Sequence, residues 1–151
     1  MNREFRMTGI ILLVCFLITA LNMKAEAGVG ENRDVNELLF GQPVKTEDVQ
    51  GYAQQITYRT RIYDVVILYT NQIARVITYR LRDGELFSIE RISGILEKNN
   101  APQDYASGYN RWYFDIQDPK APGIISFRDY RNKTTAKYNI NTAILTVRLN
   151  E

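Results

Sequence analysis

The sequence predicts an α+β fold: a single twisted antiparallel sheet of about six to seven strands, with two main helices packed on one face. Two patterns predict it. Short segments rich in Tyr, Ile and Val, several with alternating apolar and polar residues, are typical of antiparallel strands. Two other segments repeat apolar residues at three- and four-residue spacing, which is the period of an amphipathic helix.

The first helix is expected shortly after residue 30, with Asn32 or Asp34 as its N-cap. The apolar side chains expected to share one face of this helix are Val35, Leu38 and Leu39. Gly41 and the proline that follows should end the helix. Residues 44–54 show no clear strand pattern and are expected to form a loop or an irregular edge.

Seven segments have strand character, and most connections between them are short. They are residues 55–61, 63–70, 73–82, 111–115, 124–128, 134–138 and 143–149. Asn71 and Gln72 are expected to form a two-residue hairpin turn, although Asn-Gly would be a stronger signal. Between Arg61 and Asp64 the sequence permits either a tight turn or a continuous strand, since no Gly or Pro marks a turn there.

The second helix is the better defined of the two, at residues 89–98 with Ser88 as its N-cap. Its apolar stripe is formed by Ile92, Ile95 and Leu96. Lys98 lies near its C-terminus, where the helix dipole favours a cation. The order of elements divides residues 28–151, expected to form a single α+β domain, into two helix-meander units, residues 33–82 and 88–149.

Residues 1–27 resemble a secretory signal peptide. Arg3 and Arg6 precede the uncharged run 7–23, and Ala25 and Ala27 supply the small side chains of an A-x-A cleavage site. The alternatives are an uncleaved membrane anchor, for which the strongly apolar core is short, or a lipoprotein attached through Cys15. Val14 stands where lipid attachment requires a small residue, which argues against the lipoprotein.

We therefore expect the exported protein to begin at Gly28. Mass spectrometry of the exported chain measures this directly. An intact Met1 or an acylated Cys15 would show that the segment is an anchor or a lipoprotein signal instead. With the segment removed, no later stretch is apolar enough to span a membrane, and the protein is expected to be periplasmic or secreted.

The composition excludes several kinds of chemistry. The chain has no His and one Cys, and that Cys lies in the leader, so catalysis by His or Cys and the usual zinc sites are excluded. We expect no cofactor and no metal site. The net charge of the chain is +2, which does not indicate nucleic-acid binding.

Paired carboxylates are the one catalytic option that remains, as in a glycosidase-like hydrolase. The candidates are Asp64, Asp83, Glu85, Asp115 and Asp118. Each has an ordinary structural use in a turn, a loop or an ion pair, so we expect no enzyme activity and no catalytic residue.

Two further features have structural and functional interpretations. The aromatic residues Trp112, Tyr113 and Phe114, with Tyr105 and Tyr109, would be core or a platform for a sugar or peptide. The triplet that begins at Asn132 fits a glycosylation sequon, which is common by chance.

The candidate binding site is an arginine-rich face on two paired strands. Its residues are Arg59, Arg61, Arg80, Arg82, Tyr63 and Tyr79. If Thr70 pairs with Ile73 and the hairpin is regular, Tyr63 faces Arg80. A continuous strand would then place Arg61 opposite Arg82, and two like charges directly across a ladder destabilise it. The alternatives are a solvated surface with ion pairs to Asp64, Asp83 and Glu85, or a docking face for an acidic partner.

The order of these elements resembles that of a loose group of small exported bacterial proteins of unknown function. The resemblance is carried by the segments 41–43, 87–96, 127–129, 136–138 and 145–147, by the hairpin around Asn71, and by Trp112. Their helix-plus-meander layout is similar to that of beta-lactamase inhibitor protein and of small outer-membrane assembly lipoproteins. The resemblance implies fold and export, not activity. This chain departs from it at Asn71-Gln72 and lacks the lipid-attachment cysteine.

Together these features favour an exported, non-catalytic binding or adaptor module of the bacterial envelope. Its partner would be an envelope protein or an acidic polymer. The alternatives are the carboxylate-based hydrolase and a purely structural envelope protein. The sequence leaves the partner, the host and the oligomeric state open, and also whether the protein is periplasmic or extracellular and whether the two units are a true duplication.

Overall fold

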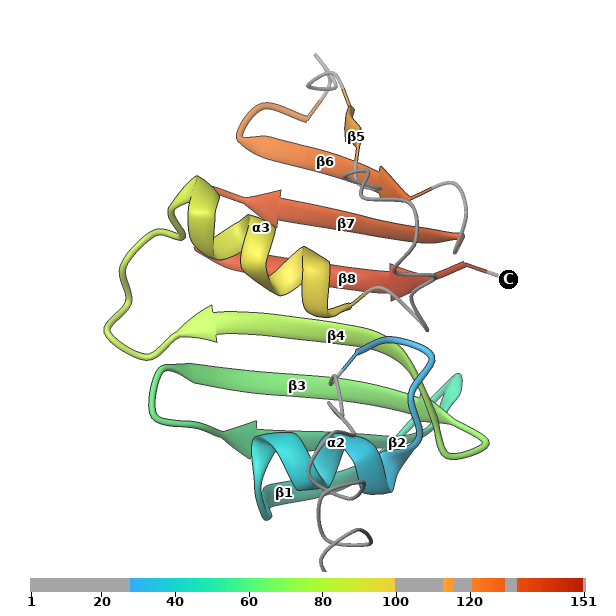
Figure 1. Ribbon diagram of the computed structural model, residues 1–151. Helices are drawn as coiled ribbons and strands as arrows, with labels where there is room; N and C mark the ends of the chain where they lie inside the picture. The colour runs from blue at the N-terminus through green and yellow to red at the C-terminus, as the bar shows by residue number, and fades with distance from the viewer. Residues whose placement is uncertain (1–27, 100–112, 116–120, 130–132, 151) are drawn as a thin grey trace, which may run out of the picture.

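The computed structural model describes residues 28–99, 113–115, 121–129 and 133–150, with the backbone alone at 113–115. The α+β class is confirmed: one open antiparallel sheet is packed with two helices (Figure 1). The helices are α2 (Arg33–Phe40) and α3 (Ile89–Lys98). The strands are β1 (Pro43–Val49), β2 (Tyr52–Arg59), β3 (Tyr63–Thr70), β4 (Ile73–Leu81), β5 (Tyr113–Asp115), β6 (Ile124–Asp129), β7 (Thr134–Asn139) and β8 (Ile144–Leu149).

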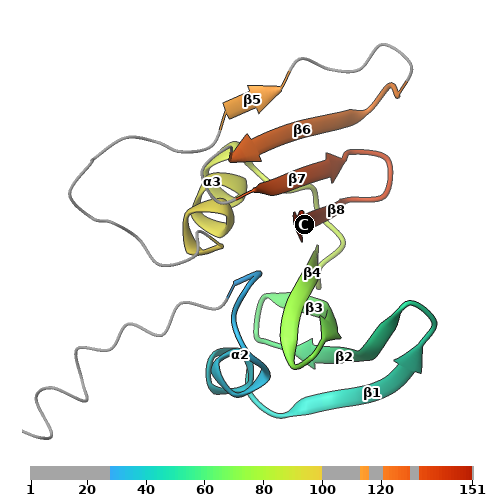
Figure 2. The same ribbon diagram turned by 90° about the vertical axis from the view of Figure 1, so that its right-hand side faces the viewer.

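The sheet has the order β1-β2-β3-β4-β8-β7-β6-β5, so each helix precedes a four-stranded meander and the two meanders meet at β4 and β8. The joining pair is regular, with Ile77 opposite Val147 and Tyr79 opposite Leu145. Viewed along the sheet, both helices lie on the same side (Figure 2). The other side carries no helix from the described part of the chain, and we call it the open face.

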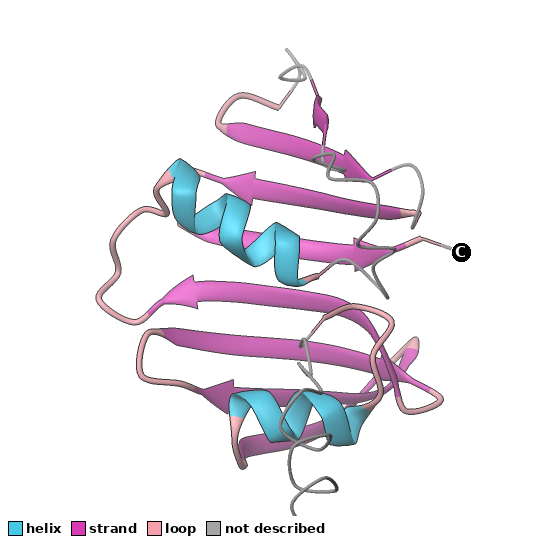
Figure 3. Cartoon of the chain, viewed as in Figure 1, coloured by secondary structure: helices cyan, strands magenta, loops and turns pink. Residues whose placement is uncertain are grey.

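The core lies between the helices and the sheet (Figure 3). One row of neighbouring residues crosses the sheet from Ile56 through Ile67 and Ile77 to Val147, and each of them is 0% exposed. Successive side chains of a strand point to opposite faces, so the residues between these positions belong to the open face. The fold therefore depends on one continuous apolar layer that both units share.

Helix α2 does not pack on the sheet through its apolar stripe. Its N-cap is Asn32, whose side chain accepts the N–H of Val35. However, Leu38 is 76% exposed and Leu39 is 41% exposed, whereas Asn36 is fully buried. Val35, Leu38 and Leu39 share one face of α2 as predicted, but this face is not the one toward the sheet, where the helix turns a mixed polar and aromatic face.

Strand β1 corrects the expectation that residues 44–54 form a loop. It pairs with β2 from Pro43 to Val49, with register shifts after Pro43 and after Glu47. These shifts and the charged residues between them are typical of a protected edge strand. The irregular edge was thus expected correctly, but the strand itself was not, and the described sheet has eight strands because of it.

The connection between β2 and β3 is a tight turn. The hydroxyl of Thr60 accepts the N–H groups of Ile62 and Tyr63, and the N–H of Thr60 donates to the carbonyl of Tyr63. A threonine that bonds its own backbone makes such a turn without Gly or Pro. Strand β2 therefore ends at Arg59, and Arg61 lies in the turn.

Helix α3 matches the prediction closely. Ser88 caps its N-terminus, and its buried residues are Ile92, Ile95 and Leu96. At its C-terminus the side chain of Asn99 is buried and makes three hydrogen bonds. It accepts the N–H of Val29 and donates to the hydroxyl of Tyr79 and the carbonyl of Ile95. This side chain ties the helix end to the sheet and to the start of the described chain.

Several predictions concern residues outside this description. The leader 1–27, the aromatic residues Tyr105, Tyr109 and Trp112, and Asp118 and Asn132 fall in segments that the structure does not describe. The side chains of Tyr113, Phe114 and Asp115 also lie outside it.

Candidate functional site

The six residues of the predicted arginine face do not share one surface. Tyr79 is 4% exposed and lies in the core, where its hydroxyl accepts the Asn99 amide. Tyr63 packs against the same core, with its ring stacked on Phe87 at a centroid distance of 6.1 Å. Both tyrosines therefore belong to the helix-covered side of the sheet.

A bulge in β4 explains why these tyrosines were misplaced. Thr70 pairs with Ile73 and Tyr69 with Ala74, as predicted, but Leu68 then pairs with Val76. Arg75 is the extra residue, and a one-residue shift moves every later side chain to the other face. The predicted pairing of Tyr63 with Arg80 is therefore wrong, because Tyr63 pairs with Leu81.

The expected clash of like charges does not occur. Arg61 lies in the turn, and the arginines that share a row on the open face are Arg59 and Arg80, with Asp64 between them on β3. The guanidinium of Arg59 donates to the Asp64 carboxylate at 2.9 Å. Arg82 donates to the carbonyl of Thr60 at 3.2 Å. An acidic residue therefore separates the two cations, as in the ion-paired interpretation.

Three cations on the open face have no ion pair within the described part of the chain. They are Arg80 on β4, Lys137 on β7 and Arg148 on β8, all exposed. Lys137 pairs with Thr146, which places Arg148 diagonally beside it on the same face. Only Arg80 of these three belonged to the predicted site. The other two were missed because the pairing of β4 with β8 is not visible in the sequence.

Apolar side chains lie beside these cations. Val66 and Leu68 of β3 are partly exposed, and Val76 of β4 is 5% exposed although it lies outside the core cluster. Leu68, Val76 and Arg148 are direct neighbours across three strands. The open face thus combines aliphatic surface with unpaired positive charge.

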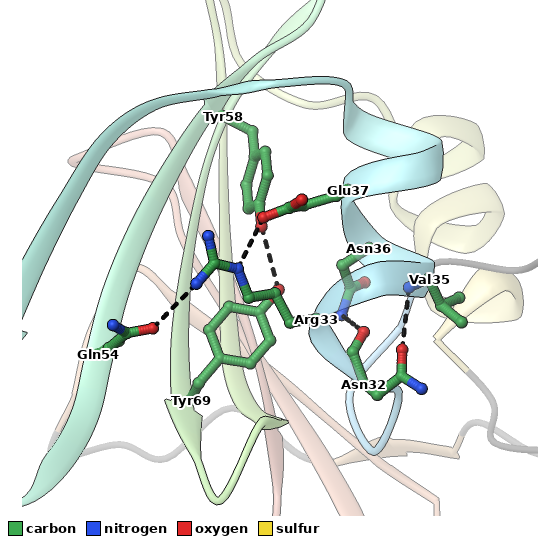
Figure 4. Close-up of polar contacts among 8 residues, drawn as sticks. All are labelled: Asn32, Arg33, Val35, Asn36, Glu37, Gln54, Tyr58 and Tyr69. Atoms are coloured by element: carbon green, nitrogen blue, oxygen red, sulfur yellow. Dashed lines mark hydrogen bonds and ion pairs between the residues drawn. The ribbon is translucent and has the colours of Figure 1, made fainter.

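A second polar cluster lies between α2 and the sheet (Figure 4). The Arg33 guanidinium donates to Glu37 at 2.6 Å and to Gln54 at 3.3 Å. Behind this pair the hydroxyls of Tyr58 and Tyr69 lie 3.3 Å apart. Burial raises the pKa of both tyrosine hydroxyls, because it disfavours their charged form.

This cluster accounts for the inverted packing of α2. Residues at positions 33, 36, 37 and 40 share one face of a helix. On that face Arg33 bonds to Gln54, while Phe40 packs against the rings of Tyr58 and Tyr79. The Asn36 amide donates to the carbonyl of Asn32, while its buried side-chain oxygen has no hydrogen-bond partner among the described residues. The cluster positions the helix on the sheet through the contact of Arg33 with Gln54.

Of the carboxylates proposed for hydrolysis, Asp64, Asp83 and Glu85 have described side chains, and none of the three is buried. Asp64 pairs with Arg59 on the open face. Asp83 accepts the N–H of Glu85 in the exposed connection after β4. Among the described residues there is no group of three or more acidic, His or Cys side chains that could hold a metal.

No described helix is long and apolar enough to cross a membrane. No family model, curated protein or solved structure matches the chain.

Proposed function

We propose that the protein is an exported, non-catalytic binding or adaptor module of the bacterial envelope. The open face of the sheet would then bind an acidic partner, which is an envelope protein or a carboxylate-bearing polymer. The observation that carries the proposal is the set of three exposed cations, Arg80, Lys137 and Arg148. They have no ion pair within the described residues and lie on the face without a helix.

The physical argument concerns the cost of placing these charges together. Lys137 and Arg148 are diagonal neighbours on adjacent strands, so their positive charges repel one another and destabilise this part of the sheet unless an anion offsets them. On this face Asp64 offsets Arg59, but no described carboxylate pairs with the other three. An acidic partner would supply the missing charge, and the neighbouring, partly exposed Val66 and Leu68 would add apolar contact. Arginine beside apolar surface is a composition enriched at binding interfaces.

The test measures binding of fluorescent poly-L-glutamate to the exported protein. Lys137→Glu with Arg148→Glu should weaken binding by about tenfold or more, because both removed charges and both new ones face the polymer. The matched control is Arg91→Glu with Lys98→Glu. This pair also exchanges one Arg and one Lys, but both are exposed on α3, on the helix side of the sheet. The control should bind within about threefold of the parent, and added salt should weaken both.

An equal loss of polyglutamate affinity in the two double variants would mean that binding depends on the net charge of the protein and not on the open face. Binding of the Lys137→Glu, Arg148→Glu variant at parental strength would exclude the open face as the docking surface. A pull-down from envelope extract with the same pair of variants then identifies the natural partner.

A further inference from the structure

The exposed apolar side chains of this protein are distributed unevenly. Among the described residues, the large hydrophobic side chains that remain exposed are Leu38, Leu39, Val44, Ile62, Leu86, Ile89 and Ile140. They come from α2, β1, the β2–β3 turn, the β4–α3 connection with the first residue of α3, and the β7–β8 turn. Single exposed apolar residues are ordinary, but their collection in one region needs an explanation.

All these segments lie at or near the same end of the sheet. The register places the start of β1, the end of β2, the start of β3 and the end of β4 side by side, since Pro43 pairs with Tyr58 and Tyr63 with Leu81. The start of β8 and the end of β7 follow at the same level, since Arg80 and Asn139 both pair with Ile144. This end, at the left of Figure 1, also receives the C-terminus of α2 and the N-terminus of α3. We call it the loop end.

The opposite end of the sheet is polar where it is described. Its turns contain Gln50 and Gly51, Asn71 and Gln72, and Lys133. No described large hydrophobic residue is exposed there. The two ends of the sheet therefore differ in polarity: exposed apolar side chains lie at the loop end, and polar turns lie at the opposite end.

Charge at the loop end is mixed. Arg59, Arg61, Arg80 and Arg82 lie in the turns or within the last two residues of their strands, and Asp64 is paired with Arg59. The carboxylates of Asp83, Glu85 and Glu90 are exposed in the same region and largely balance the remaining three arginines. Binding by this end would therefore depend on apolar contact more than on net charge.

We propose that the loop end inserts into the interfacial region of a lipid bilayer and holds the protein on a membrane surface. The apolar side chains project from several separate turns and helix ends. A bilayer accepts such side chains one by one, whereas a protein partner needs a matching surface. The arginines directly behind them can keep their charged groups at the level of the lipid phosphates while their aliphatic stems contact the acyl boundary. This proposal does not involve Lys137 or Arg148 of the open face, which lie farther along their strands, whereas Arg80 belongs to both surfaces.

The first test measures sedimentation of the exported protein with phosphatidylcholine vesicles, alone and with added phosphatidylglycerol. The parent should bind both kinds, with weak salt dependence. The triple variant Ile62→Ser, Leu86→Ser, Ile89→Ser should reduce the bound fraction by about tenfold or more, because three inserting side chains are lost. These residues are 49%, 56% and 60% exposed, so the variant should keep the parental melting temperature within a few degrees.

A matched pair of reporters tests the orientation. Leu86→Trp places an indole at the loop end, and Gln72→Trp places one at the opposite end. Brominated lipids should quench the added fluorescence of the first and leave that of the second unchanged, each relative to the parent.

Three results would overturn the proposal. They are failure of the parent to sediment with either vesicle, equal sedimentation of the triple variant, or equal quenching of the two reporters. Self-association that the triple variant abolishes, without vesicle binding, would instead assign the loop end to a second copy of the chain. Loss of polyglutamate binding in the open-face variants is a separate result, so the two proposals can fail independently.

Discussion

Val65→Ala is expected to lower the free energy of unfolding by about 2–3 kcal/mol, whereas Val66→Ala should cost about 1 kcal/mol or less. The two substitutions are chemically identical and adjacent in β3. Val65 is 0% exposed and lies in the core beside Tyr58 and Tyr79, so its truncation leaves a cavity between sheet and helices. Val66 is partly exposed on the open face, where solvent can fill the space.

Urea titrations followed by circular dichroism measure both free energies. The parent and the variants should have the same dependence on denaturant concentration, which makes the comparison direct. Similar costs for both substitutions would mean that the open face is covered as completely as the core. That result would remove the basis for a docking surface there.

Asn99→Ala should destabilise the protein by about 2–4 kcal/mol, because it leaves several buried polar groups without partners. The Asn99 side chain is 1% exposed, and it alone accepts the Val29 N–H and donates to the Tyr79 hydroxyl in the described structure. Its loss therefore weakens three connections at once: the α3 C-terminus, the start of the described chain and the centre of the sheet.

A double-mutant cycle with Tyr79→Phe tests this assignment. In the parent, Tyr79→Phe removes a hydroxyl that is hydrogen-bonded. In the Asn99→Ala background the Tyr79 hydroxyl is already unpaired. Tyr79→Phe should therefore lower the free energy of unfolding by less in that background. Additive costs for the two substitutions would show that the Asn99–Tyr79 hydrogen bond contributes little to stability.

The sequence predicted the class of fold and most elements because their patterns are strong and local. Helix α3 has a cap, an apolar stripe and a terminal cation, and the six strands other than β1 and β5 begin and end close to the expected residues. Strand β1 was missed because most of its residues are polar and its place is fixed by pairing with β2. The packing of α2 could not be predicted from its pattern, since its apolar stripe faces solvent and its polar face contacts residues on distant strands.

The candidate site was predicted less well than the fold, and one residue accounts for much of the difference. The extra residue Arg75 shifts the register of β4, which places Tyr79 in the core and Arg80 opposite Asp64. No glycine marks this bulge in the sequence. Lys137 and Arg148 were missed for another reason, since only the long-range pairing of β4 with β8 places them on the same face of the sheet as Arg80.

The central position of β8 has a consequence for the order in which the protein folds. Strand β8 is the last of the described strands in the chain, yet it fills the place beside β4 in the middle of the sheet. Until β8 pairs with β4, the first meander ends in an open edge at β4. The backbone N–H and C=O groups of that edge can pair with any other strand. Completing the sheet therefore requires a contact of long sequence separation, which slows folding and exposes the half-finished sheet to aggregation. A chain that crosses a membrane unfolded would avoid aggregation through the β4 edge only if both meanders emerge before the first one folds.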